Sequence, residues 1–90
     1  MSSQFKPVAY VKEGCPFSME FMNFIDDSDL EDEIELVWCE PGSHKMEAVR
    51  EKLSAATGEA AQFPTVEVQP GEYRTESKEL IQYFSDRYLS

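Results

Sequence analysis

The fold is decided by the segment Val8-Ala9-Tyr10-Val11-Lys12-Glu13-Gly14-Cys15-Pro16-Phe17-Ser18. Its first four residues form an apolar, β-prone run, which predicts a short buried strand. Gly14 ends this strand, and Pro16 favours a helix start because proline fits the first helical position. Apolar side chains then recur at helical spacing, so we expect a helix from about Pro16 to Asp27. Cys15 is thus predicted to lie where a strand turns into a helix.

The chain continues with a second strand and a second helix. After an acidic connection over residues 26–33, residues 34–39 alternate in the pattern of a strand, with Ile34, Leu36 and Trp38 on one face. Ser43 is a suitable cap for the next helix, and Gly58 is suited to ending it. This helix carries one apolar face, made of Met46, Val49, Leu53 and Ala56.

The last third of the sequence predicts a hairpin and a helix. Pro64 leads into a strand at residues 65–68, and a turn at residues 69–72 joins it to a strand around residues 73–75. The final helix has an apolar face made of Leu80, Ile81, Phe84 and Tyr88. The first βαβ half implies a parallel pair with a right-handed crossover, and the hairpin adds antiparallel strands. We therefore expect an α/β thioredoxin fold, βαβαββα, with a four-stranded mixed sheet flanked by three helices.

Length and charge narrow the class of protein further. Ninety residues are enough for one domain, expected to span residues 1–90. The formal net charge is −10, from 18 acidic and 8 basic side chains, and this charge disfavours nucleic acid as a partner. The negative charge favours solubility. Alternatively, it favours binding to basic protein partners. No apolar run is long enough for a membrane span, and the N-terminus lacks a secretory pattern, so we expect a cytoplasmic protein without membrane partners.

The sequence holds two cysteines, Cys15 and Cys39, and a single histidine, His44. These are too few and too widely spaced for a self-sufficient zinc site, so no metal is expected. Both thiols are free in a reducing compartment. Cys39 ends the second strand, where a half-buried thiol is the ordinary interpretation and a resolving thiol the alternative. His44 is expected to be solvated and receives no role.

The position of Cys15 gives it chemical interest. A thiolate at a helix start lies near unpaired backbone N–H groups and the positive end of the helix dipole, and such a position lowers a cysteine pKa. The thiolate is the species that attacks disulfides. The alternative is that Cys15 only caps the helix.

The stretch from Tyr10 to Ser18 resembles the active-site segment of glutaredoxins, in which a Cys-Pro-aromatic-Cys or Cys-Pro-aromatic-Ser motif opens the first helix. The later elements match in order as well, so the resemblance covers essentially the whole chain. It implies that Cys15 is catalytic and, because Ser18 stands where dithiol members have a second cysteine, that the protein is of the monothiol type. It also implies that Lys12 contacts a glutathione carboxylate and that Phe17 flanks the sulfur. The alternatives are a solvated Lys12 and a Phe17 that belongs to the core.

The same resemblance gives a role to the residues before the third strand. In thioredoxin-fold proteins the proline that matches Pro64 is cis and faces the active cysteine, and the preceding residue, here Phe63, offers backbone groups to the ligand. Glutaredoxins usually have Thr-Val before this proline, so the pair Gln62-Phe63 departs from their pattern.

The pair Glu76-Ser77 resembles an element of the glutathione transferase N-terminal domain that holds the γ-glutamyl group of glutathione. This resemblance implies that Glu76 pairs with the ammonium of the ligand, while Ser77 and the helix N-terminus bind its carboxylate. An ordinary helix start is the alternative. Transferases add a helical second domain, for which 90 residues leave no room, so a conjugating transferase is not expected.

The resemblances together imply a glutathione-dependent monothiol thiol-disulfide oxidoreductase, with glutathione as co-substrate and glutathionylated proteins or small disulfides as substrates. Two alternatives stay open. One is a module in which Cys15 and glutathione ligate an iron–sulfur cluster, although the cluster-carrying family has glycine where this chain has Pro16. The other is an adaptor that binds glutathione without catalysis.

Overall fold

The computed structural model describes residues 5–89, and the order of its elements is the predicted one. The strands are β1 (Val8–Lys12), β2 (Glu35–Cys39), β3 (Thr65–Gln69) and β4 (Glu72–Thr75), and the helices are α1 (Pro16–Asp27), α2 (His44–Thr57) and α3 (Ser77–Phe84). A π-helical turn, Ser85–Leu89, extends α3. The expectation about a secretory pattern rests partly on residues 1–4, which lie outside the described residues.

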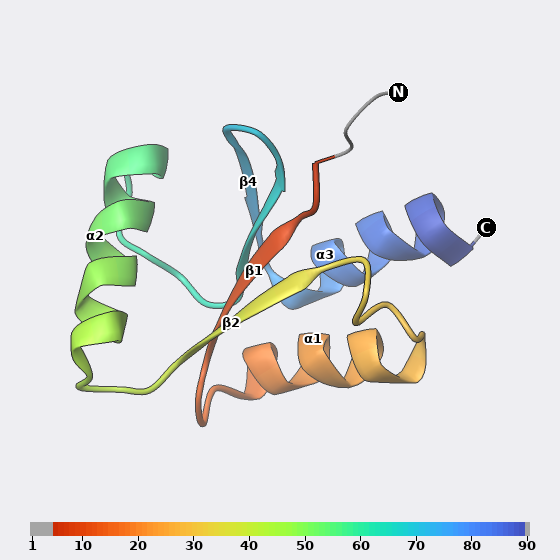
Figure 1. The fold of residues 1–90 in the computed structure, drawn as a ribbon, viewed down its shortest axis with the longest axis horizontal. Helices are drawn as coiled ribbons and strands as arrows, with labels where there is room; N and C mark the ends of the chain where they lie inside the picture. Colours follow the sequence, from red (N-terminus) through yellow and green to blue (C-terminus); the bar gives the residue numbers. More distant parts are fainter. Residues whose placement is uncertain (1–4, 90) are drawn as a thin grey trace.

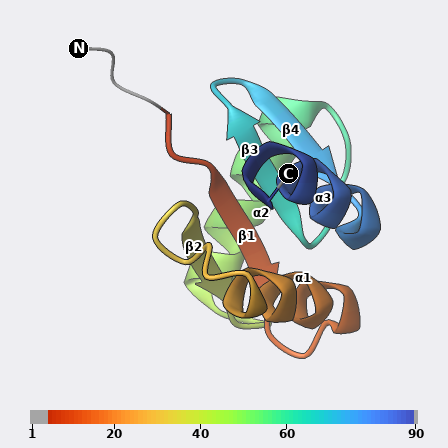
Figure 2. The same ribbon diagram turned by 90° about the vertical axis from the view of Figure 1, so that its right-hand side faces the viewer.

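The four strands form one mixed sheet in the order β2-β1-β3-β4. Strand β1 pairs parallel with β2 and antiparallel with β3, and β3 pairs antiparallel with β4. Helices α1 and α3 cover one face of this sheet and α2 covers the other (Figure 1, Figure 2). The predicted thioredoxin fold is therefore confirmed, including the parallel pair and the hairpin.

The core has two parts, one on each face of the sheet, because successive side chains of a strand point to opposite faces. The larger part joins Ala9 and Val11 of β1 to the aromatic rings of Phe21 in α1 and Phe84 in α3. The centroids of these two rings lie 5.9 Å apart, so they hold α1 against α3. The smaller part lies beneath α2 and consists of Tyr10, Cys39, Met46, Val49 and Leu53.

The ends of α2 follow the sequence signals. The Ser43 hydroxyl accepts a hydrogen bond of 3.1 Å from the Met46 N–H, and Gly58 ends the helix with a φ of 77°. Ala56 is exposed, so the buried face of the helix ends at Leu53.

Strand β2 differs from its predicted pattern of burial. Leu36 was expected on the inner face with Ile34 and Trp38, but it is 37% exposed. Ile34 is buried, Trp38 is half-buried, and Cys39 at the end of the strand is fully buried. The reason is that β2 is an edge strand, paired only with β1, so it is incompletely covered by the helices.

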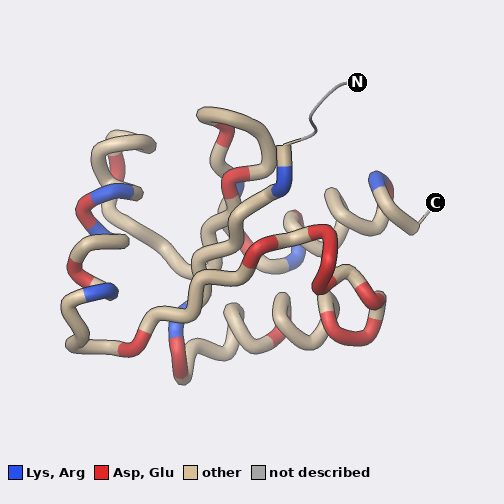
Figure 3. Tube along the Cα trace, in the orientation of Figure 1, with Lys and Arg blue, Asp and Glu red and all other residues tan. Residues whose placement is uncertain are grey.

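The negative charge is unevenly distributed. Acidic residues gather along the connection between α1 and β2, at the C-terminal end of α1 (Figure 3). A 12-residue helix is roughly 18 Å long, so these carboxylates lie well beyond a Debye length from the start of α1. Among residues 5–89, no helix has the length and apolar character needed to cross a bilayer.

Candidate functional site

Cys15 occupies the N-cap of α1, as predicted. Its backbone is extended, with φ −89° and ψ 120°, and Pro16 is the first helical residue. The turn before it is tight: the Cys15 N–H donates to the Lys12 carbonyl at 3.2 Å, and Gly14 adopts a φ of 81° that a side chain would disfavour. This turn presents a half-buried thiol at the end of β1.

The first turn of α1 surrounds the sulfur with hydrogen-bond donors. Burial of the Cys15 thiol raises its pKa, but the N–H and hydroxyl of Ser18, the N–H of Phe17 and the ammonium of Lys12 outweigh that effect. The net result is a Cys15 pKa below its ordinary value of 9.0. The predicted activation of the thiol by the helix start is thus reproduced, and Ser18 adds a side-chain donor.

The Cys15 thiol faces the loop that precedes β3. It donates a long hydrogen bond of 3.7 Å to the carbonyl oxygen of Phe63. The Phe63–Pro64 peptide bond is cis, as the resemblance implied. A ligand bound through its own sulfur to Cys15 would therefore lie against this backbone.

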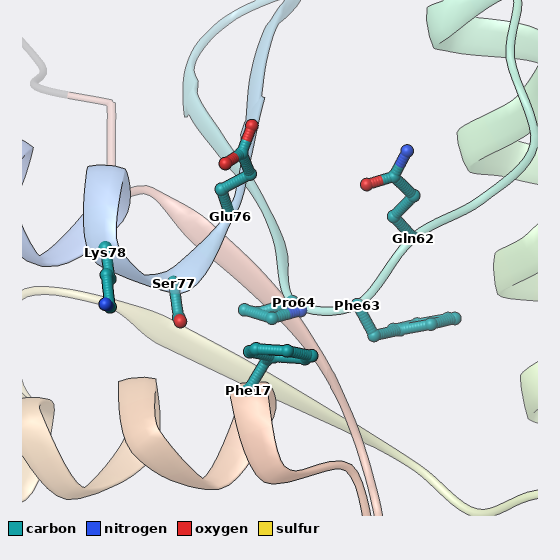
Figure 4. A pocket seen from close by; sticks show the side chains of 7 residues that line it. All are labelled: Phe17, Gln62, Phe63, Pro64, Glu76, Ser77 and Lys78. Atoms are coloured by element: carbon teal, nitrogen blue, oxygen red, sulfur yellow. The ribbon is translucent and has the colours of Figure 1, made fainter.

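Beside this contact lies a pocket with a volume of about 280 Å³. Its walls come from three places: the first turn of α1, the loop before β3 and the start of α3 (Figure 4). The lining residues are Phe17, Gln62, Phe63, Pro64, Glu76, Ser77 and Lys78. The Phe17 ring, 62% exposed, lies next to Pro64 and forms an apolar wall. The opposite wall is polar and belongs to α3.

The start of α3 has an unusual backbone. Glu76 adopts φ 70° and ψ 112°, a conformation that L-residues rarely populate and that costs free energy, on the order of 1–3 kcal/mol. Its side chain does not cap the helix by a hydrogen bond. It instead lines the pocket, with its carboxylate directed away from the side on which the Ser77 hydroxyl lies (Figure 4).

The Ser77 hydroxyl already has a partner within the protein. Ser77 is only 4% exposed, and its hydroxyl donates a hydrogen bond of 2.7 Å to the carboxylate of Glu20 in α1. A hydroxyl has one proton, so in this arrangement Ser77 can offer a ligand only its oxygen lone pairs. Donors for a ligand carboxylate remain in the backbone at the start of α3 and in the Lys78 ammonium.

The structure brings most of the proposed glutathione-binding residues together. Those that line the pocket are Phe17, Phe63, Pro64, Glu76 and Ser77, and Cys15 lies beside them through its contact with Phe63. Lys12 is not among the lining residues; its charge acts on the Cys15 thiol instead. These assignments remain predictions about ligand binding, but their convergence on one pocket is an observed property of the fold.

Three polar residues in or beside the site were not predicted from the sequence: Glu20, Gln62 and Lys78. Lys78 directly follows the Glu76-Ser77 pair, and its place in the first turn of the expected helix was a usable signal. Gln62 was noted only as a departure from the usual pattern. Glu20 gave no signal, because an acidic residue on an exposed helix face is ordinary.

Cys39 and His44 lie apart from this pocket. The Cys39 thiol is buried in the core part beneath α2, where burial raises its pKa, and it donates a long hydrogen bond of 3.9 Å to the Val37 carbonyl. His44 is the exposed first residue of α2. In residues 5–89 no group of three or more His, Cys, Asp or Glu side chains is arranged to hold a metal ion.

The fold and the pocket place the protein in the thioredoxin superfamily, with a glutaredoxin-like arrangement of strands and helices. Over residues 10–89 the chain matches the family model described as "Glutathione S-transferase, N-terminal domain", and it belongs to that family. No curated protein matches the sequence.

Two solved structures show the same fold. Oxidized glutaredoxin 2 from Chlamydomonas reinhardtii aligns with a TM-score of 0.66 and 19% identity, over 93% of this chain and 75% of that one. The glutaredoxin grx-1 from Archaeoglobus fulgidus aligns with a TM-score of 0.60 and 17% identity, over 86% of this chain and 83% of that one. At these identities the similarity shows the fold alone. The chemistry is therefore inferred from the site itself.

Proposed function

We propose that this protein is a glutathione-dependent thiol-disulfide oxidoreductase that works through the single thiol of Cys15. The observation that carries the proposal is the position of this thiol. It has a lowered pKa and lies 3.7 Å from the Phe63 carbonyl, beside a pocket whose polar wall includes Glu76 and Ser77. Transfer of a glutathionyl group requires a reactive sulfur next to polar groups that can bind the γ-glutamyl end of glutathione.

The reaction takes place in two exchanges. The Cys15 thiolate attacks the glutathione sulfur of a glutathionylated protein, forms a Cys15–glutathione disulfide and releases the protein thiolate. The thiolate of a second glutathione then attacks the glutathione sulfur of that disulfide. Oxidised glutathione leaves, and the Cys15 thiolate is regenerated. Each cycle consumes one reduced glutathione, because the other half of the oxidised glutathione comes from the substrate already at the disulfide oxidation level, so no second protein thiol is needed.

Each part of the site has a task in this cycle. The Ser18 donors and Lys12 lower the pKa of Cys15, which favours its thiolate and also makes it a better leaving group in the second exchange. Phe17 and Pro64 supply apolar surface beside the sulfur, while the backbone of Phe63 offers groups to the glutathione backbone. The start of α3 supplies N–H groups for the γ-glutamyl carboxylate. Cys39 has no part, because it is buried beneath α2.

The test is turnover of a glutathionylated peptide in the presence of glutathione, glutathione reductase and NADPH. The wild-type protein is expected to consume NADPH, and Cys15→Ser is expected to have no activity above background. Cys39→Ser is the matched control, since it removes the other thiol, and it should retain wild-type turnover.

The mixed disulfide is a second readout of the same proposal. Incubation with oxidised glutathione should add one glutathionyl group to the wild-type protein, and mass spectrometry of the peptides should place it on Cys15. Full activity of Cys15→Ser would contradict the mechanism. A protein that binds glutathione but has no turnover would instead be a non-catalytic adaptor.

A further inference from the structure

The outer edge of strand β2 has no role in the chemistry proposed above. β2 is the outermost strand of the sheet and pairs with β1, and within residues 5–89 no further strand pairs with its other side (Figure 2). The Glu35 N–H donates to the Pro7 carbonyl at 2.8 Å. At the other end of the strand, the Cys39 carbonyl accepts from the Glu13 N–H at 2.9 Å. The first and last residues of β2 therefore direct these backbone groups toward β1.

The alternate residues of β2 present the opposite side of its backbone. The N–H and C=O of one residue in a strand point to the same edge, and those of the next residue point to the other edge. Leu36 and Trp38 therefore hold two N–H and two C=O groups at the open edge, where another extended chain can pair with them. Their side chains share one face of the sheet, on which Leu36 is 37% exposed and Trp38 is half-buried. The open edge thus combines backbone partners with an apolar contact.

The acidic connection of residues 26–33 gives this edge its charge. It contains six carboxylates and no basic residue, and it leads directly into β2 (Figure 3). Within residues 5–89, the ion pair that forms joins Arg74 to Glu72, and no lysine or arginine is paired with a carboxylate of this connection. The negative charge beside the open edge is therefore not compensated within the described part of the chain.

The charge determines which kind of chain fits the open edge. A second copy of this protein would bring its own acidic connection and a net charge of −10, so repulsion disfavours pairing between copies. An extended segment rich in lysine and arginine has the opposite sign and is attracted by the same carboxylates. The acidic connection thus acts against self-association and in favour of a basic partner.

We propose that the open edge of β2 is a docking site for a positively charged, extended segment of a partner protein, which adds to the sheet as a further strand. The backbone of this segment pairs with Leu36 and Trp38, an apolar side chain covers Leu36, and basic side chains lie along the acidic connection. Neither Leu36 nor Trp38 lines the pocket beside Cys15. The inference therefore does not depend on the proposed function.

The probe is a peptide of about eight residues in which lysine and valine alternate, with both ends blocked. Its counterpart has glutamate in place of lysine. Isothermal titration calorimetry on the full chain at low salt should show that the lysine peptide binds at least about tenfold more tightly. With saturating lysine peptide, amide hydrogen exchange of Leu36 and Trp38, measured by NMR, should slow at least about fivefold. The Val37 amide, which faces β1, is the internal control and should change less than about twofold.

Two triple variants test the contribution of charge, and each removes three negative charges. The first neutralises the end of the acidic connection and consists of Glu31→Gln, Asp32→Asn and Glu33→Gln. The second neutralises exposed positions in α2 and directly after it, and consists of Glu47→Gln, Glu51→Gln and Glu59→Gln. The first should weaken binding of the lysine peptide at least about fivefold, and the second, as the matched control, less than about twofold. Circular dichroism checks that both variants are folded.

Each other outcome overturns the inference. Equal weakening by the two triple variants would mean that net charge alone governs binding. Binding of the lysine peptide without slower exchange at Leu36 and Trp38 would mean that the peptide lies on the carboxylates and does not join the sheet. Absence of binding, or equal affinity for both peptides, would leave the edge without a basic partner. Protection of the Leu36 and Trp38 amides in the protein alone, together with a dimer in sedimentation, would assign the edge to a second copy.

Discussion

The backbone N–H of Lys12 donates a hydrogen bond of 3.1 Å to the hydroxyl oxygen of Ser18. This bond joins the end of β1 to the first turn of α1, and it leaves the Ser18 proton for the sulfur of Cys15. Ser18 is fully buried, so water does not compete with either interaction. In the proposed mechanism, Ser18 thus stabilises the Cys15 thiolate without forming a disulfide itself.

The first prediction concerns this hydroxyl. Ser18→Ala removes the side-chain donor to Cys15 and leaves the backbone donors in place, so the pKa of Cys15 should rise toward its ordinary value. At pH 7 the rate of Cys15 alkylation by iodoacetamide should fall roughly threefold to tenfold, because less of the thiol is ionised. Ser54→Ala, which removes a hydroxyl from α2, is the control and should leave the rate unchanged. An unchanged rate in Ser18→Ala would show that the backbone donors suffice.

The second prediction separates the two thiols by pH. The lowered pKa of Cys15 means that its alkylation rate should rise with pH and level off with a midpoint below 9.0. Burial raises the pKa of Cys39, so its midpoint should lie above 9.0, and its rate should be lower throughout. The measurement uses Cys39→Ser to follow Cys15 and Cys15→Ser to follow Cys39. Coinciding midpoints would contradict at least one of the two directions.

The same pKa shift predicts how stability depends on pH. In the Cys39→Ser background, the folded state binds fewer protons at Cys15 than the unfolded state does, between the folded pKa of Cys15 and its ordinary value of 9.0. The stabilisation by Cys15 is therefore present above the unfolded pKa and is lost as the pH falls through the folded pKa. Urea unfolding at several pH values should show this trend, and additional replacement of Cys15 by Ser should abolish it.

The sequence predicted the order and type of all the main elements, because their signals are local. Proline after Cys15, serine at position 43 and glycine at position 58 each act on the backbone within one turn, and the structure has α1 and α2 bounded as they indicated. The exposure of Leu36 could not be predicted this way. Whether an alternating strand is covered on both faces depends on its place in the sheet, and the sequence does not state that β2 lies at an edge.

The candidate site was predictable to the extent that it consists of motif residues. Resemblance pointed to Phe63, Pro64, Glu76 and Ser77, and the fold gathers them around one pocket. The contact between Ser77 and Glu20 was not predictable, because it joins residues 57 positions apart in the chain and depends on how α1 packs against α3. Interactions of this kind appear only when the tertiary structure is known.

A further prediction concerns Lys78, the basic residue of the pocket wall. Lys78→Met keeps much of the aliphatic length and removes the charge, so binding of S-methylglutathione should weaken roughly threefold to tenfold. The affinity of the variant should also depend less on salt, because an exposed charge pair is screened. Lys45→Met on α2 is the control, as Lys45 lies outside this pocket. Equal losses in both variants would indicate that overall charge, rather than a local contact, governs binding.

The last prediction links the core to the site through Phe84, which is fully buried and holds α3 against α1 by its contact with Phe21. Phe84→Leu leaves space in the larger part of the core and should lower the free energy of unfolding by roughly 1–3 kcal/mol. It should also weaken ligand binding, because the start of α3 and Glu20 lie on the two helices that this contact holds together.

The comparison that decides this point uses Leu53→Ala, which opens the smaller part of the core beneath α2. Its cost in stability should be about 2–5 kcal/mol, at least as large as that of Phe84→Leu. Affinities for S-methylglutathione are then measured at a temperature where circular dichroism shows both variants to be folded. Phe63 of the pocket packs against the part of the core that Leu53 belongs to, but neither α1 nor α3 does, so Leu53→Ala should weaken binding less than Phe84→Leu does. Equal affinities in the two variants would mean that the packing of α1 against α3 does not set the geometry of the site.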